Sequence, residues 1–144
     1  MVIVVAGLMI AISAPRIRDR MEKINVREAK VSMANYVART RATAVSRGCN
    51  TTLNMTTGTS GKAWITSCKP TDIARSVSVD TVGTVDQIAS RYGINLSTTA
   101  NTITFSSRGI ATNFAFQTIK VTSASYSSVV DSIRVNPIGK VLLK

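Results

Sequence analysis

Cysteines and cations are the side chains of this sequence whose types and spacing could do chemistry. Cys49 and Cys68 are the only cysteines, and two thiols can form a disulfide or remain as buried free thiols. Two cysteines do not complete a zinc site, and the chain has no histidine, the commonest metal ligand and general base. We therefore expect no metal and no cofactor.

The sequence also lacks the patterns that catalysis requires. It contains no Ser-x-x-Lys pair, and no glycine-rich phosphate-binding loop follows a strand. Its seven acidic residues are scattered singly, so no pair of carboxylates is spaced for acid–base chemistry. We predict that the protein is not an enzyme.

The two cysteines flank a segment that is typical of a β-hairpin. Its midpoint falls at Gly58-Thr59, and a Gly-X dipeptide favours a two-residue turn. In that register Cys49 faces Cys68 and Leu53 faces Trp64, whereas a longer loop would shift the pairing. We predict a disulfide, which would place this part of the chain outside the cytoplasm.

Positive charge dominates the composition. The 144 residues include 18 Lys/Arg and 7 Asp/Glu, which gives a net charge of +11. Such a balance favours anionic partners, nucleic acid or phospholipid. A salt-sensitive DNA-binding patch could use Arg108, Arg134, Lys140 and Lys144. The alternatives are a solvated basic surface or cations that meet acidic neighbours.

One long helix is predicted for residues 2–47, with an interruption at Pro15. Residues 1–14 carry no charge, and no Gly or Pro occurs between Pro15 and Gly48. At 1.5 Å per residue the helix would be about 70 Å long, whereas a globule of this size is about 30 Å across. About half of the helix must therefore protrude. Its apolar part, short of the ~20 residues that span a bilayer, must lie in lipid or among partner subunits.

An apolar stripe is predicted on this helix beyond Pro15. Apolar residues recur there at intervals of three, four or seven, as on one face of a helix. The stripe contains Ile17, Met21, Ile24, Val31, Ala34, Ala38 and Val45, with Met33, Tyr36 and Val37 beside them. We expect the protein's own sheet to cover it, and a partner helix is the alternative.

After Gly48 the sequence is typical of β-structure. Ser and Thr alternate with Val, Ile and Phe, as in half-buried strands. We predict strands at 101–105, 113–121, 129–135 and 140–144, with turns at 106–109 and 136–139. Residues 86–93 form either a short helix or a loop. We expect the aromatic residues of this region in the core rather than as base-stacking platforms: Trp64, Phe105, Phe114, Phe116 and Tyr126.

The apolar N-terminal run resembles the first helix of type IV pilin-like proteins. In that family a Gly and a kinking Pro lie eight residues apart, as Gly7 and Pro15 do here. The segments "RTRATAVSRG" (39–48), "ITFSSRG" (103–109) and "IRVNPIGKVLLK" (133–144) more narrowly resemble the GspH/FimT minor pseudopilins. The resemblance implies an α+β pilin-like fold, in which a long N-terminal helix packs on an antiparallel β-sheet domain.

The resemblance also divides the chain into three parts. Residues 1–15 would be the membrane anchor and filament core, 16–48 the amphipathic half of the helix, and 49–144 the β-rich head. The family's cleavage site, aromatic first mature residue and nearby acidic residue would precede Met1 in a longer chain. The anchor residues would be Val2, Ile3, Val4, Val5, Gly7, Leu8, Met9, Ile10, Ile12 and Pro15.

A structural function follows from the resemblance. Such a subunit crosses the bacterial inner membrane once, with its head in the periplasm or outside the cell. An assembly ATPase and a platform protein then extract it into a type II secretion pseudopilus or a type IV pilus, among other pilin subunits. DNA capture for transformation is the alternative, although the family's Gly-Arg-x-Arg tail is replaced here by a Gly139-Lys140 sequence.

Overall fold

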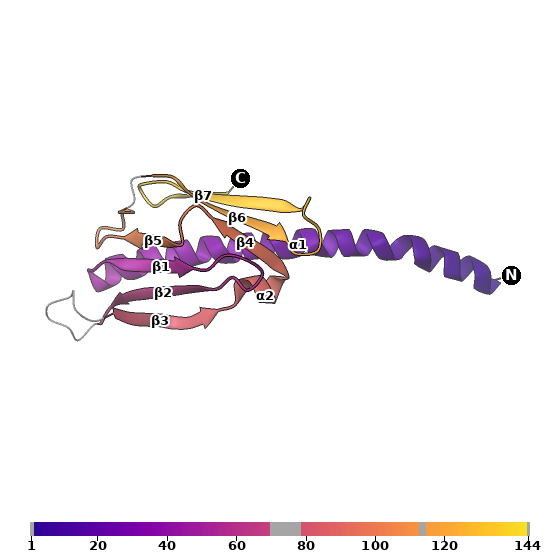
Figure 1. Cartoon of the computed structure of the whole chain (residues 1–144), viewed down its shortest axis with the longest axis horizontal. Coiled ribbons are helices and arrows are strands. Elements are labelled where there is room, and N and C mark those ends of the chain that lie inside the picture. Colours follow the sequence, from indigo (N-terminus) through magenta and orange to yellow (C-terminus); the bar gives the residue numbers. More distant parts are fainter. Residues whose placement is uncertain (1, 70–78, 113–114, 144) are drawn as a thin grey trace.

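The computed structural model describes residues 2–69, 79–112 and 115–143, with side chains from Arg18 onward. A long helix, α1 (Val2–Arg47), is followed by a β-rich head that lies along its C-terminal part (Figure 1). This arrangement confirms the α+β class.

Two four-stranded antiparallel sheets form the head. The first has the order β3-β2-β1-β5, and the second has the order β4-β6-β7-β8. Both pack against α1. The strands of the first sheet are β1 (Thr51–Met55), β2 (Ala63–Cys68), β3 (Val79–Asp86) and β5 (Thr102–Phe105). Those of the second are β4 (Ile94–Thr98), β6 (Gln117–Ser123), β7 (Val130–Val135) and β8 (Val141–Leu143).

Helix α1 continues through Pro15, so the predicted interruption is wrong. Proline lacks one backbone donor and therefore removes a single helical hydrogen bond. The turns on either side keep their own bonds, and the backbone remains helical to Arg47. Gly48 then ends the helix with a φ of 64° and donates its N–H to the Val45 carbonyl at 3.3 Å.

The β1–β2 hairpin pairs one residue away from the predicted register. Leu53 lies opposite Ile65, and not opposite Trp64. In place of a tight Gly58-Thr59 turn, residues 56–62 form a longer loop, and Gly58 bridges to β4. Leu53 and Ile65 are both buried in the core, and a slip of one residue would turn Ile65 outward. Core burial therefore selects the observed register.

The two predicted glycine turns are confirmed. Gly109 N donates to the Ser106 carbonyl at 2.8 Å, and Gly139 N donates to the Asn136 carbonyl at 2.9 Å. Both glycines have positive φ, 73° and 77°, which favours glycine over other residues.

The other predicted elements are found with altered bounds. A short helix, α2 (Ile88–Tyr92), occupies the ambiguous 86–93 segment. The strand predicted at 113–121 begins at Gln117, while residues 113–114 and Lys144 lie outside the described residues.

Candidate functional site

The sheets cover a different face of α1 from the one predicted. Met21, Ile24, Val31 and Val45 are 58%, 54%, 46% and 55% exposed. The buried residues lie on the opposite side of the helix: Val26, Ala29, Met33, Val37, Thr40 and Ala44. The prediction that the sheet covers the apolar stripe is therefore wrong for these four residues and for Ala38. Ala34 packs partly against the core, as does Tyr36 beside the stripe, while Met33 and Val37 are fully buried. The side chain of Ile17 lies outside the described part of the structure.

The covered face of α1 combines large residues, such as Met33 and Val37, with small ones. Ala29, Thr40 and Ala44 are small, and they let the strands approach the helix closely. Thr40 keeps its hydroxyl satisfied by donating to the Tyr36 carbonyl at 2.7 Å. The hydropathy pattern ranks this face below the outer one, because alanine and threonine have lower hydropathy values than isoleucine or methionine.

The exposed apolar residues of α1 form a surface that we call the outer stripe. It consists of Met21, Ile24, Val31, Ala38, Ala42 and Val45. Two hollows follow one another along it. One, of about 560 Å³, is lined by Ile24 and Val31, by Tyr92 of α2, and by the charged and polar residues Arg27, Glu28, Ser32 and Asn35. The other, of about 640 Å³, is lined by Ala38, Ala42 and Val45.

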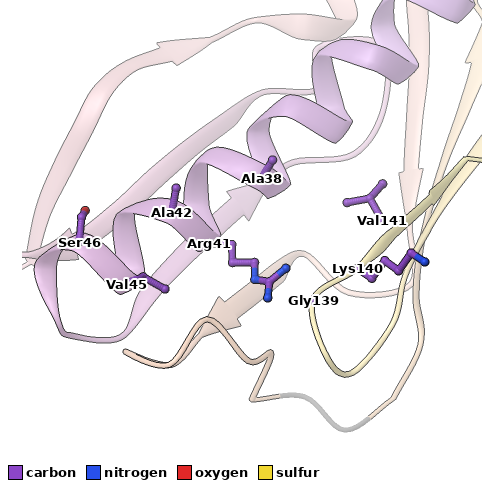
Figure 2. A pocket seen from close by; sticks show the side chains of 8 residues that line it. All are labelled: Ala38, Arg41, Ala42, Val45, Ser46, Gly139, Lys140 and Val141. Carbon is purple, nitrogen blue, oxygen red and sulfur yellow. The ribbon is translucent and has the colours of Figure 1, made fainter.

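The second hollow has a basic rim. Arg41 of α1 and Lys140 before β8 both line it, and Figure 2 shows them beside the turn that contains Gly139. A Cβ at Gly139 would lie 3.5 Å from Arg41 Cδ, so the stem of the arginine rests on this turn. A Cβ at Gly109 would lie 3.2 Å from Arg41 Nε, so the turn of residues 106–109 also meets Arg41.

The four cations predicted to bind DNA are only partly brought together. Lys140 lines the basic hollow, and Arg108 belongs to the adjoining 106–109 turn. Arg134 alternates with buried residues of β7, and its guanidinium carbon lies 4.9 Å from the ring centre of Phe116. Lys144 lies outside the described residues.

Arg41 is the cation that sequence reasoning missed. It is not among the four predicted cations, because about 100 residues separate it from Lys140 in the sequence. The fold places them at one hollow. Among the ion pairs of the described residues, neither Arg41 nor Lys140 has an acidic partner.

Polar contacts attach α1 to the head at both ends of the covered region. Ser123 Oγ donates to Glu22 Oε2 at 2.7 Å, next to the β6–β7 loop. Near the other end, Arg47 Nη1 donates to the Cys68 carbonyl at 2.8 Å and lies 3.4 Å from Asp80 Oδ2. The head is therefore held to the helix from Glu22 to Arg47.

The predicted disulfide is confirmed. Cys49 and Cys68 are bonded, with their Cα atoms 6.4 Å apart. Cys49 is two residues beyond α1 and Cys68 ends β2, so the bond links the end of the helix to the first sheet. The hydroxyls of Thr51 and Ser67 lie beside it and are hydrogen-bonded to each other at 2.8 Å.

A partly buried tyrosine joins α1 to the end of β3. Tyr36 OH donates to Asp86 Oδ2 at 3.2 Å, and Arg91 Nη2 lies 2.9 Å from Asp86 Oδ1. Burial raises the pKa of the Tyr36 hydroxyl above its ordinary value of 10.0, and the negative charge of Asp86 raises it further.

The aromatic residues divide between core and surface. Phe105 is fully buried, as predicted, and Trp64 is half-buried. Phe116 and Tyr126 are 52% and 39% exposed, so their predicted place in the core is wrong. Phe116 directly precedes β6, and Tyr126 follows the end of β6 by three residues. Phe114 lies outside the described residues.

Neither a metal site nor a membrane-spanning helix is found in the part of the chain that the structure describes. No three residues among its cysteines, aspartates and glutamates gather into a possible metal site. No helix in this part combines the length and the apolar character needed to cross a bilayer.

Comparison with known proteins decides the family. The family model described as "Type II transport protein GspH" matches residues 32–139, which is most of the chain. This protein belongs to the GspH family. No curated protein matches the GspH-family chain at a significant level.

Solved structures show the same fold. Two crystal structures of the type IV minor pilin FimU from Pseudomonas aeruginosa are each 11% identical to the GspH-family chain. One has a TM-score of 0.65 and covers 85% of this chain and 90% of its own. The other has a TM-score of 0.57 and covers 82% and 91%. The GspH-family protein therefore has the pilin fold.

Proposed function

We propose that this protein is a minor subunit of a type II secretion pseudopilus or a type IV pilus. Before assembly, residues 2–14 hold it in the bacterial inner membrane. An assembly ATPase and a platform protein then extract it. The observation that supports this proposal is the reach of α1. Figure 1 shows its N-terminal part projecting well beyond the strands. A projecting helix of this composition requires an apolar environment.

The contacts of the head with α1 also support this proposal, because they begin well after the apolar segment. The first described residue of α1 that bonds to the head is Glu22, and the first buried residue is Val26, while residues 18–21 are exposed. Residues 2–14 carry no charge. Burial of their eight large aliphatic side chains is worth on the order of 10–20 kcal/mol, at about 1.5–3 kcal/mol for each. Lipid supplies that burial before assembly, and neighbouring helices supply it afterwards.

A charge placed in the projecting segment tests the proposal. Leu8→Lys is expected to remove the full chain from the membrane fraction and from sheared filaments, because a buried ammonium is costly in either place. Leu142→Lys, at an exposed position of β8, is the matched control and is expected to change neither. Equal membrane retention and filament entry of both variants would contradict the proposal.

DNA capture is a second candidate function, and the basic hollow favours it. Arg41 and Lys140 line one hollow beside the Arg108 turn, and cations without acidic partners attract phosphate. We expect the double variant Arg41→Glu/Lys140→Glu to lose DNA retardation and to show a weaker dependence of binding on salt. Lys62→Glu, in the β1–β2 loop, is the control for charge alone. A loss that is proportional to net charge in all variants would argue against a site.

A further inference from the structure

A cluster of cations surrounds α1 directly beyond its uncharged segment. We call Arg16, Arg18, Arg20 and Lys23 the basic collar. The side chains of the last three are exposed, and none of them has an acidic partner among the ion pairs of the described residues. Figure 1 shows α1 projecting from the head in this region, so the strands do not cover the collar.

The collar lies at the level where a bilayer would end if segment 2–14 were embedded in it. Arg16 lies about 3 Å beyond Ala14 along the helix axis, and Lys23 about 13 Å. The head groups of one leaflet form a layer about 5–8 Å thick. Long basic side chains can bend toward this layer while their stems lie along the helix. The collar cations are therefore within reach of lipid phosphates.

Membrane topology does not account for these cations. Basic residues beside a membrane segment are usually retained on the cytoplasmic side. Here they lie on the same side of segment 2–14 as the Cys49–Cys68 disulfide, a kind of bond that persists outside the cytoplasm. Cations on that side of the membrane require another role.

Nearby carboxylates neutralise only part of the collar. Asp19 and Glu22 fall within it, and four cations with two carboxylates leave a net charge of +2. The Glu22 carboxylate is turned to the head, where it accepts the hydroxyl of Ser123 at 2.7 Å. The collar therefore presents a positive surface around the helix.

The adjoining edge of the head is uncharged. The backbone N–H of Tyr126 donates to Ser123 Oγ at 3.1 Å, and the same hydroxyl is bonded to Glu22. The loop of residues 124–129 therefore lies beside the collar, and it contains no charged residue. Tyr126 is 39% exposed there, and tyrosine is enriched where proteins meet the surface of a bilayer.

We infer that the basic collar binds the anionic head groups of phospholipids in the leaflet beside the head. The inference rests on the proposed function, because segment 2–14 must first enter a bilayer, and it names the class of lipid that the membrane-bound subunit prefers. Charge complementarity supports this occupant, and so does the direct continuity of the collar with the apolar segment. A nucleic acid or an acidic protein would have to enter the head-group layer to reach the first cations, whereas lipid phosphates are already there.

Partition into vesicles of two compositions tests the inference. The full chain, purified in detergent, is diluted into vesicles of phosphatidylcholine alone or of phosphatidylcholine and phosphatidylglycerol in equal parts, and the bound chain is measured by flotation. We expect the partition coefficient at low salt to be about tenfold or more higher for the anionic vesicles, because each basic residue near such a surface contributes about fivefold. This preference should largely disappear at about 1 M salt, where charges are screened within about 3 Å.

Two charge-matched double variants locate the site. Arg20→Gln/Lys23→Gln should partition equally into both kinds of vesicle, because it leaves two cations and two carboxylates in the collar. Arg39→Gln/Lys69→Gln removes the same residue types from exposed positions. Arg39 lies about 24 Å beyond Lys23 along α1, so this control should keep the preference of the parent. Both variants should keep the thermal unfolding temperature of the parent chain.

Arg27 gives a readout of depth. It is exposed and lies four residues after Lys23, on the same face of the helix, but about 20 Å beyond Ala14. This height exceeds that of the head-group layer by more than the Debye length of about 8 Å. Arg27→Gln should therefore lower the preference by less than about twofold, and Arg20→Gln by about fivefold. Equal losses would indicate the general attraction of a cationic protein and overturn the inference.

The outcomes separate the inference from the proposed function. If the parent partitions equally into both kinds of vesicle, the lipid assignment is wrong although segment 2–14 still inserts. The assignment also fails if Arg39→Gln/Lys69→Gln loses as much of the preference as the collar variant. Loss of the collar variant from filaments, with no lipid preference in the parent, would show that an acidic protein surface meets the collar, which overturns the assignment too. If the parent enters neither kind of vesicle, both the proposed function and the inference fail.

Discussion

The ammonium group of Lys30 lies 2.7 Å from Oδ1 of Asp131, and this ion pair joins α1 to β7 across 101 residues of sequence. The two side chains are only 13% and 25% exposed. The backbone N–H of Ser132 donates to the same carboxylate oxygen at 2.8 Å and holds it in place. A pair so shielded from solvent is stronger than an ordinary surface pair.

We expect Asp131→Asn to lower the free energy of unfolding by about 1–3 kcal/mol, because it removes the carboxylate charge beside a partly buried ammonium. In a double-mutant cycle with Lys30→Met, the coupling energy should be about 1–2 kcal/mol. Urea unfolding of the four proteins measures both quantities. A coupling energy of zero would mean that the pair does not help to hold the helix to the head.

Gly139 is expected to tolerate no side chain. A Cβ there would lie 2.8 Å from Cε1 of the buried Phe105 ring, and the residue has a φ of 77°. We expect Gly139→Ala to cost about 2–4 kcal/mol, from overpacking together with the left-handed backbone. Gly93→Ala is the control, since Gly93 has a φ of 61° but no atom within 4 Å of the new methyl group. It should cost about 1 kcal/mol. Equal losses in chemical unfolding would show that packing on Phe105 contributes nothing.

The disulfide is expected to contribute substantially to stability. It joins residues 19 apart in sequence. Closing a loop of this length lowers the conformational entropy of the unfolded chain and so raises its free energy by about 3 kcal/mol. The double variant Cys49→Ala/Cys68→Ala should lose about 2–4 kcal/mol in urea unfolding. The parent chain under reducing conditions serves as the comparison and should lose a similar amount. If the variant unfolds at the same urea concentration as the oxidised parent, the bond is not a stabilising link.

The raised pKa of the Tyr36 hydroxyl predicts that the folded chain loses stability at alkaline pH. Burial and then Asp86 raise the pKa of its hydroxyl above 10.0, the ordinary value that it regains on unfolding. The unfolded chain therefore releases this proton at a lower pH than the folded chain. The stabilisation is complete below pH 10 and is lost as the pH rises through the folded pKa.

The difference between the parent chain and Tyr36→Phe isolates this contribution. We expect the parent to lose stability more steeply than the variant as the pH rises above 10, measured by urea unfolding at each pH. Identical slopes in the parent and in Tyr36→Phe would contradict the contact with Asp86.

Local patterns predicted most of the elements. The absence of Gly and Pro between Pro15 and Gly48 predicted a helix that the structure confirms to Arg47. The turns ending at Gly109 and Gly139 were predictable because their four residues suffice to define a turn. The register of β1 and β2 was not, since a loop that reaches β4 and a core that buries Ile65 involve residues far away in sequence.

The sequence by itself determined that this chain forms a long helix with an uncharged end, a β-rich head and a pair of cysteines able to bond. These features depend on backbone preference, on the period of apolar residues and on the length of a helix, all of which are local. Only the tertiary structure decided which side of α1 the head covers and which cations meet at the basic hollow. A helix with two apolar sides can be covered on either, and contacts with strands far away in the sequence decide that the side with Ala29, Met33 and Ala44 is the buried one.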